Sequence, residues 1–236
     1  ASTRPDLYLT SMKLFRKINK WFENQENLFY LFLAVLIVPN IVLCFTEPMP
    51  LVAKVCNVVL PFSIYYIVMS GSRNCGKTFW ILFPFLFFGA FQIVLLYLFG
   101  QSIIAVDMFL NLVTTNSSEA LELLDNLIPA IVIVVLLYIP ALFLAAVSVA
   151  KKRKLPEIFI HRERRRARIV MILGVLSLGT AYLFDSRYEL KSDLYPANVC
   201  YNIALAFQRT AQTQNYAKTS KDFTFQAKAT HPEENR

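Results

Sequence analysis

The chain contains few of the residues that build metal sites and disulfide frameworks. Its 236 residues include two histidines, His161 and His231, which lie far apart without neighbouring cysteines or clustered aspartates. A metal site built by this chain alone is therefore not expected. No two of the four cysteines have the spacing of a metal or redox motif, so we interpret them as small apolar side chains.

Charged residues are also scarce. They make up 17% of the chain and hydrophobic residues 56%, whereas soluble domains average about 25% and about 45–50%. The excess lies in long runs, as in integral membrane proteins. The net charge of +8 would suit nucleic acid, but the Lys and Arg residues adjoin the hydrophobic runs, where membrane topology and anionic lipids explain them better. We expect a membrane partner and no nucleic acid.

Five hydrophobic runs predict an all-α membrane protein with five transmembrane helices. Each run is close to the roughly 17–25 residues that a helix needs to cross the hydrocarbon core. Such a run must be helical in lipid, because no water satisfies its backbone groups. The fifth span could begin within the basic segment before it. The predicted spans, within a domain of residues 28–184, are 28–45, 51–69, 79–100, 128–150 and 169–184.

Lysine and arginine alternate between the connections. Segment 1–27 holds five and segment 151–168 holds nine, whereas the first connection and segment 101–127 hold none. The positive-inside rule then predicts a cytoplasmic N-terminus and places segment 101–127 outside. The residues after Phe184 are predicted to lie outside as well.

The two ends of the chain differ in character. Residues 1–27 form a basic amphipathic segment with Trp21 and Phe22, which predicts an anchor on the cytoplasmic leaflet. Residues 185–236 have few long apolar runs. There we predict a juxtamembrane helix near residues 198–217 on the outer surface, followed by a linking segment rather than a globular core.

A strongly polar stretch, 107–122, lies between the third and fourth spans, on a predicted outer-surface helix near 103–125. At about 100° per residue its polar side chains share an arc about 140° wide. Asn111, Thr115 and Glu119 are four residues apart and drift only about 80°. An amide, a hydroxyl and a carboxylate so placed can bind an ammonium group and its neighbouring oxygens. A solvated helix face remains the other interpretation. Weaker candidates for the same site are Asp107 and Glu122.

These residues resemble a known family across essentially the whole chain. The match is to the N-terminal membrane domain of lipid A phosphoethanolamine transferases, sulfatase-like enzymes that include the mobile colistin-resistance enzymes. It rests on the order of the five spans, on a spaced polar set and on one run in the tail. These residues are Asp107, Asn111, Thr115-Asn116, Glu119, Glu122-Leu123 and Tyr195-Pro196-Ala197-Asn198.

The resemblance implies a protein of the bacterial inner membrane with a periplasmic C-terminus. Asn111, Thr115 and Glu119 would then help to shape the pocket for phosphatidylethanolamine, the donor lipid. In a periplasmic domain after the juxtamembrane helix, a zinc-bound threonine would attack this lipid, and the phosphoethanolamine group would pass to lipid A. The added cation reduces attraction for cationic peptides such as polymyxins.

The chain itself departs from the complete family pattern. It holds no threonine nucleophile motif and no zinc-binding cluster of Asp, Glu and His, so we assign it no catalytic residue and no cofactor. On this interpretation the zinc belongs to a catalytic domain that these residues do not include, and residues 185–236 connect to it.

Two alternatives remain. The chain could anchor a different sulfatase-like enzyme, such as a glycerol-phosphate polymerase, because nothing in it identifies the acceptor. It could also be a small transporter or membrane scaffold without enzymatic activity. Transporters often place charges at mid-membrane and contain internal repeats, whereas these spans are nearly free of charge and show no repeat.

Overall fold

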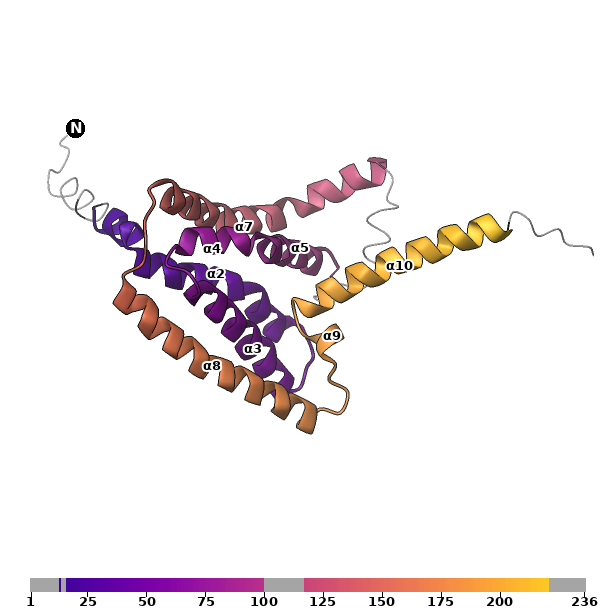
Figure 1. The fold of residues 1–236 in the computed structure, drawn as a ribbon. Coiled ribbons are helices and arrows are strands. Elements are labelled where there is room, and N and C mark those ends of the chain that lie inside the picture. Colours follow the sequence, from indigo (N-terminus) through magenta and orange to yellow (C-terminus); the bar gives the residue numbers. More distant parts are fainter. Residues whose placement is uncertain (1–12, 14–15, 100–116, 221–236) are drawn as a thin grey trace, which may run out of the picture.

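The computed structural model describes residue 13, residues 16–99 and residues 117–220. Within this part of the chain the regular secondary structure is helical and no strand occurs. Four helices are long and apolar enough to cross a membrane, and a bent pair makes a fifth span if it is counted as one. The described residues therefore form an all-α membrane protein (Figure 1).

The helices follow one another with short connections, apart from the gap before α7. Residues 16–23 are also helical. The membrane-crossing part of α7 runs from Ile128 to Ala150. The helices of the described chain are α2 (Gln25–Thr46), α3 (Leu51–Ser70), α4 (Cys75–Ile81), α5 (Phe83–Phe99), α7 (Ser117–Ala150), α8 (Glu157–Phe184), α9 (Leu190–Asp193) and α10 (Ala197–Ser220).

Asparagine and proline set several helix starts. The side chain of Asn24 accepts a hydrogen bond from the backbone N–H of Glu26 at the start of α2. Asn74 does the same for Lys77 at the start of α4. Such caps satisfy N–H groups that have no partner within the helix. Pro50 and Pro156 directly precede α3 and α8.

The predicted third span, 79–100, is a broken helix. Helices α4 and α5 meet at an angle of 59° around Leu82. Pro84 lies in the first turn of α5, where its ring would clash with the carbonyl of Trp80 if the helix continued. The span therefore begins earlier than predicted, at Cys75, and bends near its start.

The helix containing the fourth predicted span is longer than predicted. Helix α7 runs without interruption from Ser117 to Ala150, so the expected break between an outer helix ending near residue 125 and a span starting at 128 is absent. Pro129 lies inside α7 and does not end it, since proline in a membrane helix is tolerated where the freed carbonyl is satisfied otherwise.

The fifth helix also begins earlier than the span predicted at 169–184. Helix α8 starts at Glu157 and includes the basic residues up to Arg168. Pro156 sets this start, and Glu163 is fully buried on the α8 face that meets α3. The last helix, α10, spans Ala197–Ser220, where the sequence predicted a helix over 198–217.

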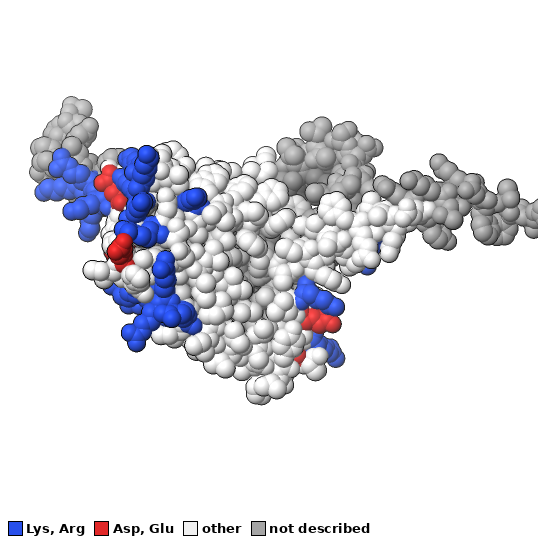
Figure 2. All heavy atoms as spheres, in the orientation of Figure 1, with Lys and Arg blue, Asp and Glu red and all other residues white. Residues whose placement is uncertain are grey.

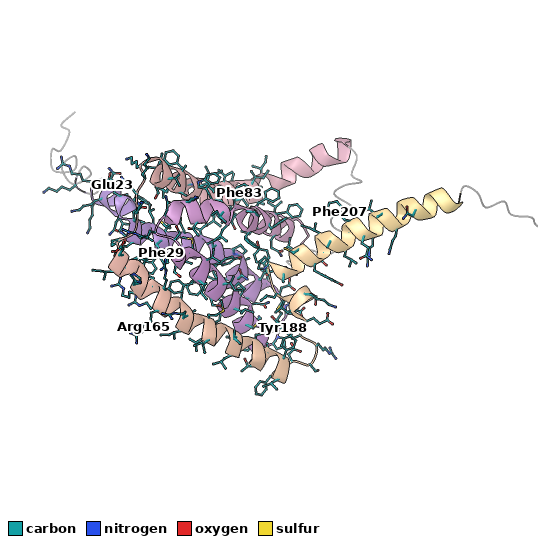
Figure 3. All side chains as sticks on the ribbon, in the orientation of Figure 1. Glu23, Phe29, Phe83, Arg165, Tyr188 and Phe207 are labelled. Carbon is teal, nitrogen blue, oxygen red and sulfur yellow. The ribbon has the colours of Figure 1, made fainter. Side chains whose placement is uncertain are left out.

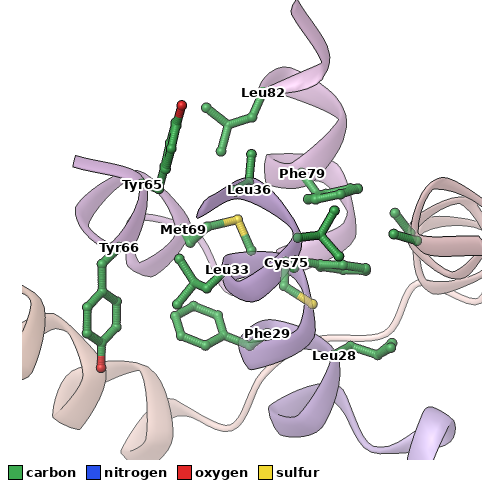
Figure 4. Close-up of a cluster of buried hydrophobic side chains, with 14 of the residues drawn as sticks. Leu28, Phe29, Leu33, Leu36, Tyr65, Tyr66, Met69, Cys75, Phe79 and Leu82 are labelled. Atoms are coloured by element: carbon green, nitrogen blue, oxygen red, sulfur yellow. The ribbon is translucent and has the colours of Figure 1, made fainter. Parts of the chain in front are cut away.

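The helices form two groups joined by α2 (Figure 1). Helix α8 lies along α3, and α4 and α5 lie along α7, while α2 contacts α3, α5 and α7. Aromatic rings fill the centre: Phe32 and Phe79 stack at 4.3 Å between ring centroids. Phe29, Met69 and Cys75 belong to the same buried cluster and are fully buried (Figure 4).

Basic residues mark one end of the molecule. Lys and Arg gather where α2 begins and where α7 connects to α8, at the left of Figure 2. We call this the basic end. The opposite end, where α8 finishes and α9 lies, carries a few charges of both signs.

Candidate functional site

The predicted polar stretch falls largely outside the described residues. Asp107, Asn111 and Thr115 lie among residues 100–116, which the structure does not describe. The backbone at Glu119 and Glu122 belongs to the first turns of α7, but their side chains are not described either. The proposed grouping of Asn111, Thr115 and Glu119 stays a prediction.

A different set of polar residues is well placed at the end opposite the basic residues. Residues 185–196, here called the connector, join α8 to α10 and include α9. Asn40 of α2 is fully buried and donates from Nδ2 to two carbonyl oxygens. One belongs to Asn57 at 2.8 Å and the other to Tyr195 at 2.9 Å. This single amide ties α2 to both α3 and the connector.

Asn57 of α3 holds the connector at two further points. Its Nδ2 donates to the carbonyl of Asp193 at 2.7 Å. Its Oδ1 accepts from the hydroxyl of Tyr188 at 3.1 Å. Tyr188 lies where α8 and the connector meet at the end of the bundle (Figure 3). Asn40 and Asn57, with these three partners, are called the asparagine clamp below.

Tyr195 extends the clamp to α5. Its side chain is buried, and its hydroxyl donates to the carbonyl of Phe85 at 3.0 Å. Burial raises the pKa of Tyr188 and Tyr195 above the ordinary value for tyrosine. Both phenols therefore stay protonated and keep donating. Helices α2, α3 and α5 together fix the position from which α10 begins.

An apolar cavity of about 430 Å³ lies beside the clamp. Its walls come from α3, from the α4–α5 bend, and from the connector with the first turn of α10. None of its lining side chains is charged. The lining residues are Leu60, Pro61, Ile64, Tyr65, Val68, Leu82, Phe85, Leu190, Leu194, Pro196, Ala197 and Cys200.

Buried polar atoms without partners lie on the α5 and α7 side of the clamp. Both amide atoms of Gln92 and the hydroxyl of Tyr138 have no hydrogen-bond partner. One turn before Gln92, a Cβ at Gly89 would lie 2.9 Å from the Tyr138 hydroxyl and 3.0 Å from that of Tyr195. A buried polar group without a partner costs about 1–3 kcal/mol, and the tight packing at Gly89 leaves no room for a larger side chain beside these hydroxyls.

The buried carboxylate of Glu163 lies at the basic end, and its hydrogen bonds and ion pairs indicate a role in stability. It accepts a hydrogen bond from Tyr66, and its Oε1 lies 3.1 Å from Arg162 and 2.9 Å from Arg166. Within the described residues, no three His, Cys, Asp or Glu side chains gather in a way that could hold a metal ion.

Sequence reasoning missed the clamp, although a signal was present. Asn40 and Asn57 are amides inside hydrophobic runs, and polar residues within membrane helices usually bond to another segment. The run from Tyr195 to Asn198 was singled out only by the family resemblance, and its contacts with the bundle were not predicted. The distant partners of the two asparagines, 155 and 136 residues further along the chain, could not be read from spacing.

Comparison with known proteins identifies no relative of this chain. The chain matches no family model, no curated protein and no solved structure. The described residues form an all-α membrane protein in which buried amides of α2 and α3 bind the connector that precedes α10.

Proposed function

We propose that the chain is the membrane domain of a lipid A phosphoethanolamine transferase. In this role it holds phosphatidylethanolamine for a periplasmic sulfatase-like domain. One observation carries the proposal: two segments leave the bundle at the same end, opposite the basic end. Helix α7 begins there at Ser117, with Glu119 and Glu122 in its first two turns, and α10 extends from there (Figure 1).

The distribution of charge supports the orientation that this function needs. Basic residues favour the cytoplasmic side, so the opposite end would face the periplasm of a bacterial inner membrane. With the bent α4–α5 pair counted as one span, five crossings give an N-terminus and a C-terminus on opposite sides. The start of α7 and the start of α10 would then both meet the outer leaflet.

The residue types near the start of α7 supply the recognition chemistry. Glu119 would pair with the ethanolamine ammonium, and Asn111 and Thr115 would donate or accept hydrogen bonds at its neighbouring oxygens. Covalent transfer would take place in the following domain, where zinc and a threonine nucleophile act. The chain described here would bind and orient the donor lipid.

The asparagine clamp supports this division of work. A domain that follows α10 can act on a lipid in the bundle only if α10 holds a fixed position. Asn40 and Asn57 bind the backbone of the connector at Tyr195 and Asp193, which fixes where α10 begins.

Lipid A modification tests the proposal directly. The full-length gene that encodes this chain is expressed with Glu119→Gln, and lipid A is analysed by mass spectrometry. Loss of a charge-assisted hydrogen bond of about 1.5–3 kcal/mol predicts roughly 10- to 100-fold less phosphoethanolamine addition. Glu189→Gln, in the connector, removes an exposed carboxylate and should leave the modification unchanged.

Two results would overturn the proposal. One is lipid A that is modified equally with and without the Glu119 carboxylate at equal expression. The other is a sequence after Arg236 that lacks a strand leading into a threonine nucleophile motif.

A further inference from the structure

The apolar cavity beside the clamp lies at the level of the lipid hydrocarbon. Its α3 wall runs from Leu60 to Val68, in the interior of a span that begins at Leu51 and ends at Ser70. Its volume of about 430 Å³ falls within the roughly 300–1,000 Å³ of ligand pockets. The cavity is therefore large enough for a ligand and is surrounded by membrane.

One side of the cavity faces lipid. Ile64 and Val68 line the cavity and are 44% and 37% exposed. Leu60 and Leu82, by contrast, are buried and form the inner wall. A ligand can thus enter sideways from the bilayer without crossing the bundle.

The lining selects an apolar ligand. Among the lining side chains, only the Tyr65 hydroxyl and the Cys200 thiol are polar, and none is charged. A head group or another ion would lose its hydration there without gaining a partner. Around a membrane-spanning helix, the hydrocarbon chains of phospholipids are the apolar molecules at high concentration.

We propose that this cavity binds one acyl chain of a membrane phospholipid, between α3 and the first turn of α10. The connector covers the chain through Leu190, Leu194 and Pro196. The clamp fixes this cover, because Asn40 binds the Tyr195 carbonyl and Asn57 binds the Asp193 carbonyl. That the bound lipid is the phosphatidylethanolamine donor rests on the proposed function, whereas the acyl-chain site does not.

Photo-crosslinking can locate the chain. The purified protein is placed in nanodiscs with phosphatidylethanolamine that carries a diazirine in its acyl chain, and the adducts are mapped by mass spectrometry. Adducts are expected to concentrate at residues 60–68 and 196–200. The exposed face of α7 around Ile131–Ile139 reports contact with ordinary surrounding lipid. Adducts no denser in the cavity than on α7 would overturn the proposal.

Filling the cavity separates a specific site from surrounding lipid. Ala197→Phe places a ring in the cavity and should lower adducts at residues 60–68 several-fold, while those on α7 persist. Ile64→Phe replaces a side chain that is 44% exposed at the mouth of the cavity and should act in the same direction. Val132→Phe on the exposed face of α7 is the matched control and should leave the cavity adducts unchanged. Cavity adducts that persist in both filled variants contradict the proposal.

The head group then distinguishes this site from the proposed function. Phosphatidylglycerol with the same photoreactive chain is compared with phosphatidylethanolamine. Equal cavity labelling by both lipids supports the acyl-chain site but contradicts a role specific to the phosphatidylethanolamine donor. Preferential labelling by phosphatidylethanolamine supports the acyl-chain site and the proposed function together. If neither lipid gives adducts at residues 60–68 while α7 is labelled by both, no acyl chain occupies the cavity and the proposal fails.

Discussion

The two ends of the helical bundle are fastened by different chemistry. At the basic end, the fully buried carboxylate of Glu163 joins Tyr66 of α3 to Arg162 and Arg166 of α8. At the opposite end, the neutral amides of Asn40 and Asn57 bind backbone carbonyls of the connector.

This difference indicates what each end is built to do. A buried carboxylate is costly to desolvate and remains only where several partners compensate it, so the basic end couples α3 and α8 tightly. Neutral amides have a small desolvation cost and directional hydrogen bonds. They suit the fixing of one short segment, and the connector is such a segment. We therefore expect loss of the carboxylate to loosen the contact between α3 and α8 at the basic end, and loss of an amide to loosen the connector.

Removal of the buried carboxylate should have the largest effect. Glu163→Leu leaves the hydroxyl of Tyr66 without its acceptor and removes the charge-assisted bonds to both arginines. We expect a loss of about 2–4 kcal/mol in the free energy of unfolding, seen as a lower Tm in detergent by circular dichroism.

Glu163→Gln is the conservative partner of this variant. It keeps an acceptor for Tyr66 and loses only the charge, so its loss of stability should be smaller. An unchanged Tm in Glu163→Leu would show that the carboxylate does not hold this end together.

Removal of one clamp amide should have a local effect. Asn57→Leu is close in volume but leaves the Asp193 carbonyl without its donor. It also removes the Oδ1 acceptor of the Tyr188 hydroxyl, which keeps only its contact with Cys56 Sγ at 3.5 Å. About 2 kcal/mol of local destabilisation should increase opening of the connector roughly 30-fold. Arg187 and Lys191 are exposed trypsin sites in this segment, so the rate of tryptic cleavage there measures the opening.

The control for this experiment compares the two ends. Val55→Leu changes an exposed apolar residue of the same helix and should leave cleavage at the parental rate. Glu163→Gln should also leave it unchanged while lowering Tm. Equal acceleration of connector cleavage by the two polar variants would show that the ends are not independent.

The contact between α3 and α8 connects the two ends and depends on a glycine. A Cβ at Gly174 would lie 2.6 Å from Oγ of Ser63, which is itself bonded to the carbonyl of Leu60. Gly174→Ala should therefore cost about 1–3 kcal/mol, lowering Tm and accelerating connector cleavage together.

Gly179 of the same helix is the matched control. A Cβ there meets nothing within 4 Å, so Gly179→Ala should stabilise α8 by about 0.5–1 kcal/mol through helix propensity. A fall in Tm of the same size in both variants would mean that helix packing does not decide the outcome.

The sequence predicted the class of fold because lipid imposes helices on long apolar runs. Its errors lie where a single residue alters a helix. Pro84 breaks the third span, and α7 continues through Pro129 across the break predicted between residues 125 and 128. The fifth helix begins within the basic segment, as the sequence had left open, because Pro156 sets its start.

The candidate site was less predictable, for a physical reason. The stripe of Asn111, Thr115 and Glu119 follows from helical periodicity, and it remains a prediction. The clamp instead joins Asn40 and Asn57 to the connector through contacts between distant segments. Periodicity reports which face a residue occupies and contains no information on the segment that faces it.

The smallest expected effect comes from an ion pair on the surface of the basic end. Arg73 pairs with Glu157, and their side chains are 42% and 68% exposed. Water and salt screen such pairs, so Glu157→Gln should cost no more than about 1 kcal/mol, and less at high salt. Glu163→Gln removes a carboxylate of the same helix whose side chain is 0% exposed. Measuring both variants in low and high salt isolates the contribution of burial. If the Glu157 variant loses as much stability as the Glu163 variant, the basic end is held by surface charge, and its contrast with the neutral clamp no longer rests on burial.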